Sequence, residues 1–298
     1  MTHPNREFVS LVVDGLRYGF WPWATTSREG YPTTHDESKR VVLMEEKELF
    51  LWAQLVHEQS LGRTSEEVGR DLLPGMYCMP CYIVPKPQLG WHLVNDLSAG
   101  TFSLNSMVDR RFVTGYWLDN LGHLGELLLK KYQHYEGKQV MWKSDISEAY
   151  QMCPMHLMWQ IKQGVWILGK LYIDRVNQFG GCASPAIFIV VNGLVAWIAK
   201  HEHLVEDLIY VDDSFGIEDE GEVLWYALYE CELPKQQVKL LLLWDELGIP
   251  HKQEKQIHGK KLTILGIDVD VEELSFMLTE EARAHLMNEL EEWSQRGV

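Results

Sequence analysis

Apolar and polar residues recur along the chain with helical spacing in some stretches and with strand-like spacing in others. Helical spacing predicts packing helices, and one of them opens with Thr64 or Ser65, which suit an N-cap. Another has Pro185 at its first position, where a missing N–H is tolerated. The expected helices cover residues 39–59, 64–73, 118–135, 184–203, 221–232 and 235–247, and a segment from Thr279 onward.

Shorter apolar runs bounded by Gly and Pro predict β-strands. Two of them flank the turn "PKPQLG" (85–90), and two others form a hairpin with Asp212 and Asp213 at its tight turn. The expected strands cover residues 81–84, 91–96, 138–146, 208–211 and 214–217, and residues 261–270 as one strand or a pair of strands. The order of elements predicts a mixed α+β fold in which acidic residues stand at strand ends.

Composition indicates a globular protein of one or two domains, because 298 residues with 46% hydrophobic content and 12 tryptophans can bury a large core. The start of the chain has no signal-peptide pattern. The longest apolar stretch, 187–199, is interrupted by Asn192 and is shorter than a bilayer span. We therefore expect an intracellular protein that is not secreted and has no membrane partner.

The five cysteines fit a reducing compartment without a disulfide framework. Cys78 and Cys81 have zinc-like spacing, but no second Cys or His pair follows at the spacing of a structural site. Buried thiols are the default interpretation, and zinc is the minor alternative.

The net charge of −16 argues against a nucleic-acid partner if charge is averaged over the chain. The acids concentrate, however, in residues 45–48, 218–222 and 280–292. Average charge therefore does not determine the charge around a site.

Three aspartates are the candidate metal ligands. Asp212 and Asp213 are adjacent like charges, which remain ionised together when they are solvated or bridged by a cation. Asp145 ends an apolar strand, next to the main-chain carbonyl of Ile146. Such oxygen ligands suit Mg²⁺, and two ions about 3.5–4 Å apart would clamp a phosphoryl transfer. The alternatives are an ordinary acidic turn at 212–213 and a helix N-cap at Asp145.

Five segments carry distinctive motifs. They are "VPKPQLGWHLVNDLSAGTFSLNSMV" (84–108), which "LLPGM" (72–76) precedes, "KSDISEAY" (143–150), "QFGGCASPAIF" (178–188), "YVDD" (210–213) and "LGIPHKQEKQ…LTILGIDVD" (247–270). These segments occur in the order and approximate spacing of reverse transcriptase motifs, and the chain resembles that family over at least residues 72–270. The segment 84–108 is most similar to the polymerases of DIRS-type, tyrosine-recombinase retrotransposons and related fungal retroelement genes.

The resemblance implies a right-hand polymerase architecture of fingers and palm, with an antiparallel palm sheet packed on helices and a thumb that is missing or only begun. Residues 1–71 would form an N-terminal helical extension packing on the fingers, 72–270 the fingers and palm, and 271–298 the C-terminal helix at the start of the thumb or connection. RNase H and recombinase regions would be encoded elsewhere, which fits a polyprotein fragment or a truncated copy.

The resemblance also implies the catalytic residues. Asp145, Asp212 and Asp213, with the Ile146 carbonyl, would hold two Mg²⁺ ions, for which Mn²⁺ is a possible substitute. Tyr150 matches the aromatic gate that excludes a ribose 2′-hydroxyl and so favours dNTPs. Without the motif, Tyr150 reads as a core aromatic.

Other positions match the nucleotide-binding pattern. Lys86 matches a cation on the triphosphate, and either Lys252 or Lys255 matches the cation that protonates pyrophosphate, although all three also read as solvated charges. His92 stands where the family typically has arginine, and it lacks the charge and bidentate fork of that residue. The residues expected beneath the templating base and nucleotide are Phe179, Gly180, Gly181, Ser184 and Pro185, a segment that otherwise reads as a strand-to-helix turn.

Three functions remain open. The first is an RNA-directed DNA polymerase that acts on an RNA or DNA template with a primer and dNTPs, in the nucleus or cytoplasm. The second is an inactive or repurposed domain that binds nucleic acid or a protein partner, favoured by His92 and by the acidic balance. The third is another two-metal phosphoryl transferase.

Overall fold

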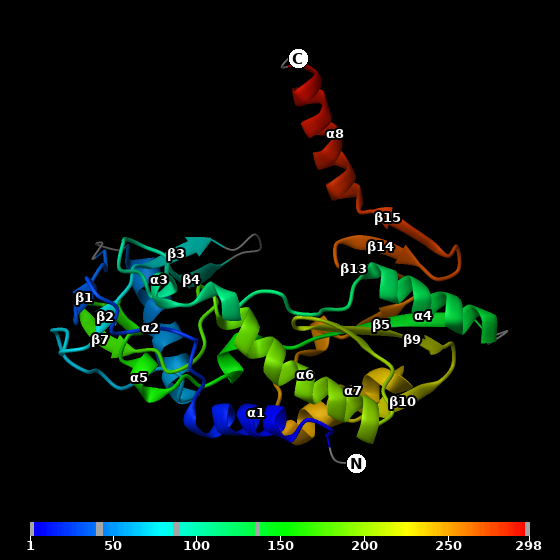
Figure 1. The fold of residues 1–298 in the computed structure, drawn as a ribbon. Coiled ribbons are helices and arrows are strands. Elements are labelled where there is room, and N and C mark those ends of the chain that lie inside the picture. The colour runs from blue at the N-terminus through cyan, green and yellow to red at the C-terminus, as the bar shows by residue number, and fades with distance from the viewer. Residues whose placement is uncertain (1–2, 40–43, 86–89, 135–137, 296–298) are drawn as a thin grey trace. The chain divides into compact units, whose positions relative to one another are not determined.

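The computed structural model describes residues 3–39, 44–85, 90–134 and 138–295. It divides into two compact units (Figure 1). Unit 1 comprises Trp117–Ser147 and Val195–Val298, and unit 2 comprises Thr2–Tyr116 and Glu148–Leu194. Each unit is described by itself below. The domain boundaries expected from the sequence, at residues 71 and 270, stay a prediction.

Unit 1 is built on a four-stranded antiparallel sheet with the order β12-β5-β9-β8. A second antiparallel sheet has the order β13-β14-β15, and β10 and β11 form a separate hairpin. The strands are β5 (Gln139–Asp145), β8 (Leu208–Tyr210), β9 (Asp213–Asp219), β10 (Val223–Tyr226), β11 (Cys231–Pro234), β12 (Ile257–Gly259), β13 (Lys261–Ile264), β14 (Ile267–Asp270) and β15 (Ser275–Leu278).

Helices α4 (Leu121–His134), α7 (Lys235–Leu247) and α8 (Glu280–Gln295) and the turn η3 (Gln253–Lys255) complete unit 1. Alternation along β5 and β9 directs apolar side chains onto α4 and the β13–β14 hairpin. Helix α8 follows β15 and has no buried residue (Figure 1). The core of unit 1 consists of Leu124, Leu128, Met141, Phe215, Ile217, Ile264, Val269 and Val271.

Unit 2 contains a four-stranded sheet with the order β1-β2-β6-β7 and the two-stranded hairpin β3–β4. Helix α2 packs Leu51 and Leu55 against Val165, Ile167 and Tyr172. The elements are α1 (Arg6–Tyr18), β1 (His35–Asp36), α2 (Glu45–Ser60), β2 (Tyr77–Cys78), β3 (Cys81–Pro85), β4 (Trp91–Asn95), α3 (Leu104–Met107), η1 (Arg110–Phe112), η2 (Ala149–Met152), α5 (Leu157–Gln160), β6 (Gly164–Ile167) and β7 (Lys170–Ile173).

Helix α6 (Ser184–Glu202) begins in unit 2 and ends in unit 1. By length and composition it is apolar enough to cross a bilayer, and 44% of its most apolar window is buried within the protein. The core helix of a soluble protein has the same properties, so α6 is weak evidence for a membrane span. The helix is longer than the apolar run 187–199 seen in the sequence.

Most of the expected elements form. The strands around the 85–90 turn are β3 and β4, although residues 86–89 lie outside the described residues. The expected helix at 39–59 is α2, which begins at Glu45, and residues 40–43 are likewise outside the described part. The helix expected from Thr279 is α8, and the Thr279 hydroxyl accepts a hydrogen bond from the Ala282 N–H.

The prediction of a helix at 64–73 is wrong. This segment pairs with the end of β7 instead, because the Ser65 N–H donates to the Ile173 carbonyl and the Ile173 N–H donates to the Ser65 hydroxyl. Gly69 has a φ of +142° and forms an isolated bridge with Leu171. The polar residues that resembled a helix cap therefore serve a long-range sheet contact.

The prediction of a helix at 221–232 is also wrong, because this segment lies in the β10–β11 hairpin. Its sequence "VLWY" (223–226) is β-branched and aromatic, which suits a strand. Tyr226 and Leu233 are buried, whereas the residues facing outward remain exposed. A strand alternation was read as helical spacing.

The acidic hairpin differs from expectation by one residue. Tyr210 pairs with Asp213, so the two-residue turn is Val211–Asp212, and Asp213 is the first residue of β9. Val211 has a φ of +57°, an uncommon conformation for a β-branched residue. Asp212 lies in the turn, and Asp213 belongs to the sheet.

Gly216 provides a stability test of the β5–β9 pairing. A Cβ atom at this position would lie 2.8 Å from Trp142 Cζ2 and 2.9 Å from the Glu206 carbonyl oxygen. We expect Gly216→Ala to lower the free energy of unfolding by about 1–3 kcal/mol, measured by urea denaturation, because a packed indole must shift. Gly193→Ala on α6 is the control, since its Cβ meets open space and should be neutral or stabilising. Equal effects of the two variants would contradict this packing.

Candidate functional site

Two of the predicted metal ligands stand opposite each other on neighbouring strands of unit 1. Asp145 is the last residue of β5 and pairs in register with Asp213, the first residue of β9. Asp212 lies in the adjoining turn, and its main-chain carbonyl accepts a hydrogen bond of 3.4 Å from the Ile146 N–H. The antiparallel register therefore brings all three carboxylates to one end of the sheet.

The environment of Asp212 disfavours its charge. Burial is the main cause that raises the pKa of this carboxyl above its usual range, and the negative charges of Asp145 and Asp213 raise it further. Lys255 opposes the shift. A cation next to these three acids would lower the cost of ionising Asp212.

Two lysines already neutralise part of this charge. Lys255 Nζ lies 2.7 Å from Asp145 Oδ1, and Lys143 Nζ lies 2.9 Å from Asp213 Oδ2. Both pairs are partly exposed, with side-chain exposures of 20–40%. Of the two candidates for a phosphate-binding cation, Lys255 thus lies at the carboxylates, whereas Lys252 precedes it at the start of η3.

The carboxylates fit a hard divalent cation by their chemistry, because the candidate ligands are all oxygens. Among the residues that the structure describes, however, no three or more His, Cys, Asp or Glu side chains are grouped closely enough to hold a metal ion. Asp145 and Asp213 are directed to lysines instead. Metal binding at this sheet end would require the two ion pairs to open or to share their carboxylates.

The loop that carries Lys255 is bonded to β5 through the main chain. The Ser147 N–H donates to the Pro250 carbonyl at 2.8 Å, and Gln256 Nε2 donates to the Asp145 carbonyl at 3.4 Å. His251 forms a bridge with Ile146 and lies 3.1 Å from Asp245 Oδ1. Lys255 is therefore held next to Asp145 by several contacts besides its own ion pair.

The residues expected at the nucleotide lie in unit 2. Tyr150 belongs to η2, and its ring centroid lies 4.8 Å from that of Phe179 and 5.8 Å from that of Phe188. Phe179 is 62% exposed, whereas Phe188 is buried. Tyr150 therefore has one aromatic neighbour in the core and one at the surface. The first contact fits the core aromatic and the second fits the nucleotide-facing residue, the two interpretations that the sequence allowed.

The Gly180–Gly181 segment requires glycine for close packing. A Cβ at Gly180 would lie 2.3 Å from the Asn95 carbonyl oxygen, and a Cβ at Gly181 would lie 2.4 Å from Ser184 Oγ. Ser184 is buried, and its hydroxyl donates to the Gln178 carbonyl. These contacts are structural ones, within the turn that precedes α6 and between that turn and the end of β4.

His92 is exposed on β4 and lines a cavity of about 140 Å³ in unit 2. Lys86, the other residue expected near a triphosphate, lies outside the described residues. Phe179 and Gly180 line the same cavity, so it contains three of the predicted substrate residues. The other lining residues are Gln54, Leu55, Glu58, Thr64, Leu93, Val94, Asn95, Gln151, Val165, Ile167, Asp174 and Gln178.

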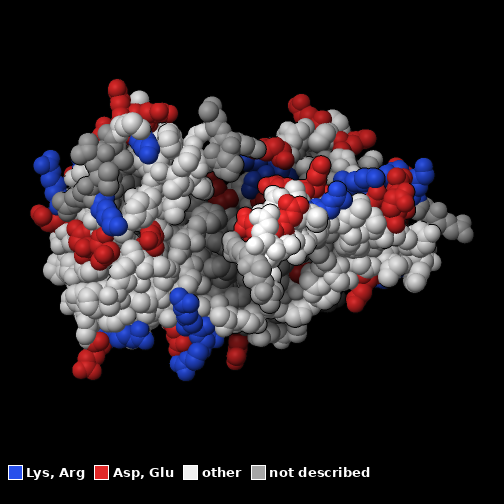
Figure 2. Space-filling model, turned by 90° about the horizontal axis from the view of Figure 1, so that it is seen from above, with Lys and Arg blue, Asp and Glu red and all other residues white. Residues whose placement is uncertain are grey.

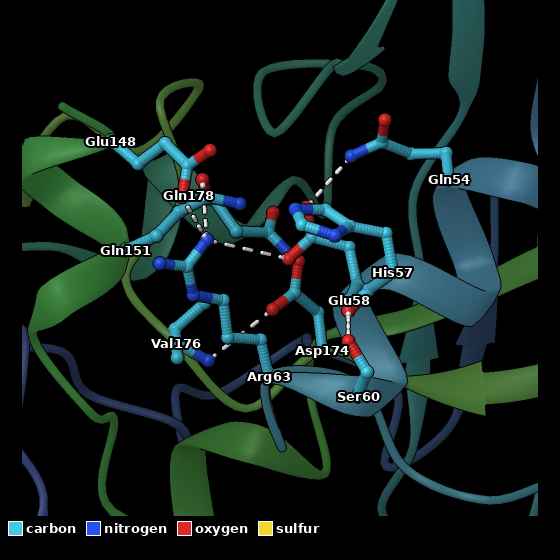
Figure 3. Close-up of polar contacts among 10 residues, drawn as sticks. All are labelled: Gln54, His57, Glu58, Ser60, Arg63, Glu148, Gln151, Asp174, Val176 and Gln178. Carbon is cyan, nitrogen blue, oxygen red and sulfur yellow. Dashed lines mark hydrogen bonds and ion pairs between the residues drawn. The ribbon is translucent and has the colours of Figure 1, made fainter. Parts of the chain in front are cut away.

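Arg63 lies among acidic and amide groups beside this cavity (Figure 3). Its Nη1 is 2.6 Å from Glu148 Oε2, 3.4 Å from Gln151 Oε1 and 3.7 Å from Glu58 Oε2. Only 12% of the Arg63 side chain is exposed. Glu148 has a φ of +55° and directly precedes η2, so this ion pair fixes the turn that carries Tyr150.

Asp174 is the strongly perturbed acid of this cluster. Burial raises its pKa to about 7, and the Glu58 charge adds to the rise. Hydrogen bonds from the Val176 N–H and Gln178 Nε2, together with the Arg63 charge, oppose it. Asp174 thus titrates near neutral pH inside a wall of the cavity.

The thiols at Cys78 and Cys81 also have a definite environment. Burial raises the pKa of each to about 12, so both are protonated at neutral pH. All five cysteines of the chain are free. These are the properties of structural thiols.

Sequence reasoning missed Lys143 and the Arg63 cluster. Lys143 had a detectable signal, because residues 143 and 145 share one face of a strand and a diagonal partner on β9 is then within reach. Arg63 had no such signal, since Glu148 is 85 positions away and the two meet only through the fold.

The surface charge is mixed on the face seen in Figure 2, where Lys and Arg side chains are interspersed with Asp and Glu. No separation into one acidic and one basic side is visible in that view. The net charge of −16 therefore does not describe the local field, as the acidic segments of the sequence suggested.

Asp174 gives a test of the buried cluster. Its pKa is about 7 in the folded protein and about 4 in the unfolded chain, so the folded state binds more protons between these values and stability falls as pH rises through them. Asp174→Asn should remove that fall. We expect its free energy of unfolding, relative to the wild type, to rise by on the order of 1–2 kcal/mol between pH 5 and pH 8.

Denaturant titrations at several pH values measure this difference. Asp14→Asn on the exposed face of α1 is the matched control and should show no such trend. A pH-independent difference for Asp174→Asn would mean that its carboxyl titrates in the ordinary acidic range.

Comparison of the chain with protein-family models and with curated proteins gives no match. Its fold is similar to solved structures of the foamy viral protease-reverse transcriptase. The complex with an RNA/DNA hybrid has a TM-score of 0.60 at 16% identity, covering 97% of this chain and 36% of that one. A complex with double-stranded DNA has a TM-score of 0.59 at 18% identity, covering 97% and 55%.

The native prototype foamy virus enzyme matches at a TM-score of 0.57 and 15% identity, covering 82% of this chain and 28% of that one. The chain thus spans between about a quarter and just over half of the length of these solved proteins. At such identities the similarity concerns the fold alone. The protein has a mixed α+β, reverse-transcriptase-like fold.

Proposed function

We propose that this protein is the core of an RNA-directed DNA polymerase. The observation that supports it best is the register of Asp145 with Asp213 at a sheet end, next to Asp212, within a reverse-transcriptase-like fold. Similar solved proteins were captured with double-stranded DNA or an RNA/DNA hybrid. Neither the fold nor the acids alone would specify a polymerase.

Asp145, Asp212 and Asp213 are the proposed ligands of two Mg²⁺ ions, with the Ile146 carbonyl as a further oxygen and Mn²⁺ as a substitute. Bound Mg²⁺ would supply neutralisation of the charge that develops on the attacking and leaving oxygens. In the reaction, a primer 3′-hydroxyl attacks the α-phosphate of a dNTP and pyrophosphate leaves. Lys255, already at Asp145, is better situated than Lys252 to assist the leaving group.

The nucleotide-facing residues are proposed from unit 2. Tyr150 would lie against the sugar and exclude a 2′-hydroxyl, and its contact with the exposed Phe179 supports a surface-accessible aromatic pair. Gly180 and Gly181 would permit close approach of the backbone. His92 and Lys86 would face the triphosphate. Ser184 would act only through the turn, because its hydroxyl is bonded internally.

The finer assignments belong to the same proposal. Unit 1 would correspond to the palm and most of unit 2 to the fingers, and α8 to the beginning of a thumb or connection. The source would be a retroelement of the DIRS type or a related fungal element. Template and primer, RNA or DNA, and dNTPs are its partners, in the nucleus or cytoplasm.

The second candidate is a related domain that binds nucleic acid or a protein partner without polymerising. Two observations favour it: the carboxylates are paired with Lys255 and Lys143, and His92 replaces an arginine fork. A folded sample that binds template–primer but does not extend it, with either Mg²⁺ or Mn²⁺, would support this candidate over the polymerase.

Asp212→Asn tests the metal site. The rate of primer extension on an RNA template with dNTPs and Mg²⁺ should fall by about 10²- to 10³-fold or more, because the variant lacks a carboxylate that would bind Mg²⁺. The bound metal would stabilise the negative charge that develops in the transition state. Glu232→Gln, an exposed acid on β11, is the matched control and should retain full activity. An unchanged extension rate in Asp212→Asn would reject the polymerase mechanism.

His92→Arg tests whether β4 limits the reaction. Arginine can bind a phosphate through two hydrogen bonds at full charge, so we expect the KM for dNTP to fall by about 5- to 10-fold. His92→Lys restores charge without the fork and separates the two effects. If neither variant alters dNTP kinetics, this edge of the cavity does not contact the triphosphate.

A further inference from the structure

Trp117 is a large aromatic residue with no assigned role, and 76% of it is exposed. It precedes α4 in unit 1, and its ring is stacked on that of His123 with centroids 5.2 Å apart and an interplanar angle of 28°. One face of the indole is therefore covered by a parallel ring. The high exposure leaves the remaining surface of the indole to solvent.

The stacked pair is anchored to the strand that leads to the acidic turn. Asp119 Oδ1 lies 2.9 Å from His123 Nδ1, and Asp119 Oδ2 accepts a hydrogen bond of 2.8 Å from the Ile209 N–H on β8. The Asp119 N–H donates in turn to the Ile209 carbonyl at 3.0 Å. Asn120 caps α4 by accepting hydrogen bonds from Gly122 and His123. The His123 ring is thus held by its hydrogen bond to Asp119 and its stack on Trp117, and Asn120 bonds the His123 main chain.

We propose that Trp117 is a stacking platform for a nucleobase of a bound nucleic-acid strand. Exposed aromatic rings bind bases of any sequence through their π-faces, and a ring held in place loses little freedom on binding. The stack also needs no positive charge. Stacking therefore suits a chain with a net charge of −16. The nearby Asp119 carboxylate is hydrogen-bonded by the Ile209 N–H and by His123 Nδ1.

The platform belongs to the same unit as the carboxylates. Ile209, to which Asp119 is bonded, lies on β8, the strand that leads into the turn carrying Asp212. The inference rests on the proposed function in one respect: the strand bound at Trp117 would be the one that reaches the proposed reacting end in the same unit.

The experiment uses the full chain and a template–primer carrying 2-aminopurine at successive template positions. Position-dependent quenching should identify a base that stacks on Trp117. Trp117→Leu should abolish that quenching and weaken binding by about 5- to 100-fold, and Trp117→Phe should restore most of both. The matched control is Trp225→Leu, since Trp225 is 62% exposed on β10 and should be dispensable.

Salt dependence separates stacking from a charge effect. The ratio of Kd values for Trp117→Leu and the wild type should stay constant as salt rises, because no counterions are released by this contact. If Trp117→Leu binds as tightly as the wild type, the inference is wrong even when primer extension occurs. Quenching that depends on Trp117 without any extension would retain the platform and reject the polymerase. Absence of any binding by the wild type would reject both.

Discussion

Repulsion among three carboxylates is the constraint on which the arrangement of unit 1 depends. The β5–β9 register sets Asp145 opposite Asp213, and the strained Val211–Asp212 turn adds the third acid. Directly opposed like charges destabilise a sheet, so this register needs compensation. Lys143 and Lys255 provide it at distances of 2.9 and 2.7 Å. Burial is the main cause of the raised pKa of Asp212, and the charges of Asp145 and Asp213 add to it.

The same constraint connects stability with function. A sheet shaped only by stability would not gather acids at one strand end, because opposed like charges are destabilising. The arrangement is understandable if the acids serve a cation-dependent reaction, with lysines as the counterions when no metal is bound. The domain without polymerase activity would explain it equally well if the lysine pairs are permanent. What separates these two accounts is therefore how readily Lys143 and Lys255 release their partners.

Unit 2 handles buried charge differently. The Arg63 side chain is mostly buried and faces Glu148 and Glu58. Burial raises the pKa of the nearby Asp174 carboxyl to about 7, so this group takes up a proton more readily than an exposed aspartate. Burying a charge without a partner is costly, so Glu148 and Glu58 are paired with Arg63, whereas Asp174 has a pKa raised by burial. Through Glu148 this cluster holds the turn carrying Tyr150. A proposed specificity residue thus depends on an ion pair far from it in sequence.

The sequence predicted the α+β class, the strands β3, β4 and β5 and the helices α4, α6 and α7, because each has strong periodicity or clear Pro and Gly boundaries. It also predicted that the three aspartates would converge if the 138–146 strand lay beside the 208–217 hairpin, which is the observed β5–β9 pairing. It failed where tertiary pairing overrides local signals, at 64–73 and at 221–232, and it placed the acidic turn one residue late. Contacts between distant positions, such as Arg63 with Glu148, have no local pattern.

The acidity of the whole chain is a weak argument against a nucleic-acid partner. Phosphate binding depends on local cations and base binding on aromatic surface, and neither follows from a sum of charges. Lys143 and Lys255 are local cations at the sheet end, and Trp117 is aromatic surface in the same unit. A protein that contacts bases by stacking can remain acidic overall. It would lose less affinity at high salt than a basic binding protein, because fewer counterions are displaced.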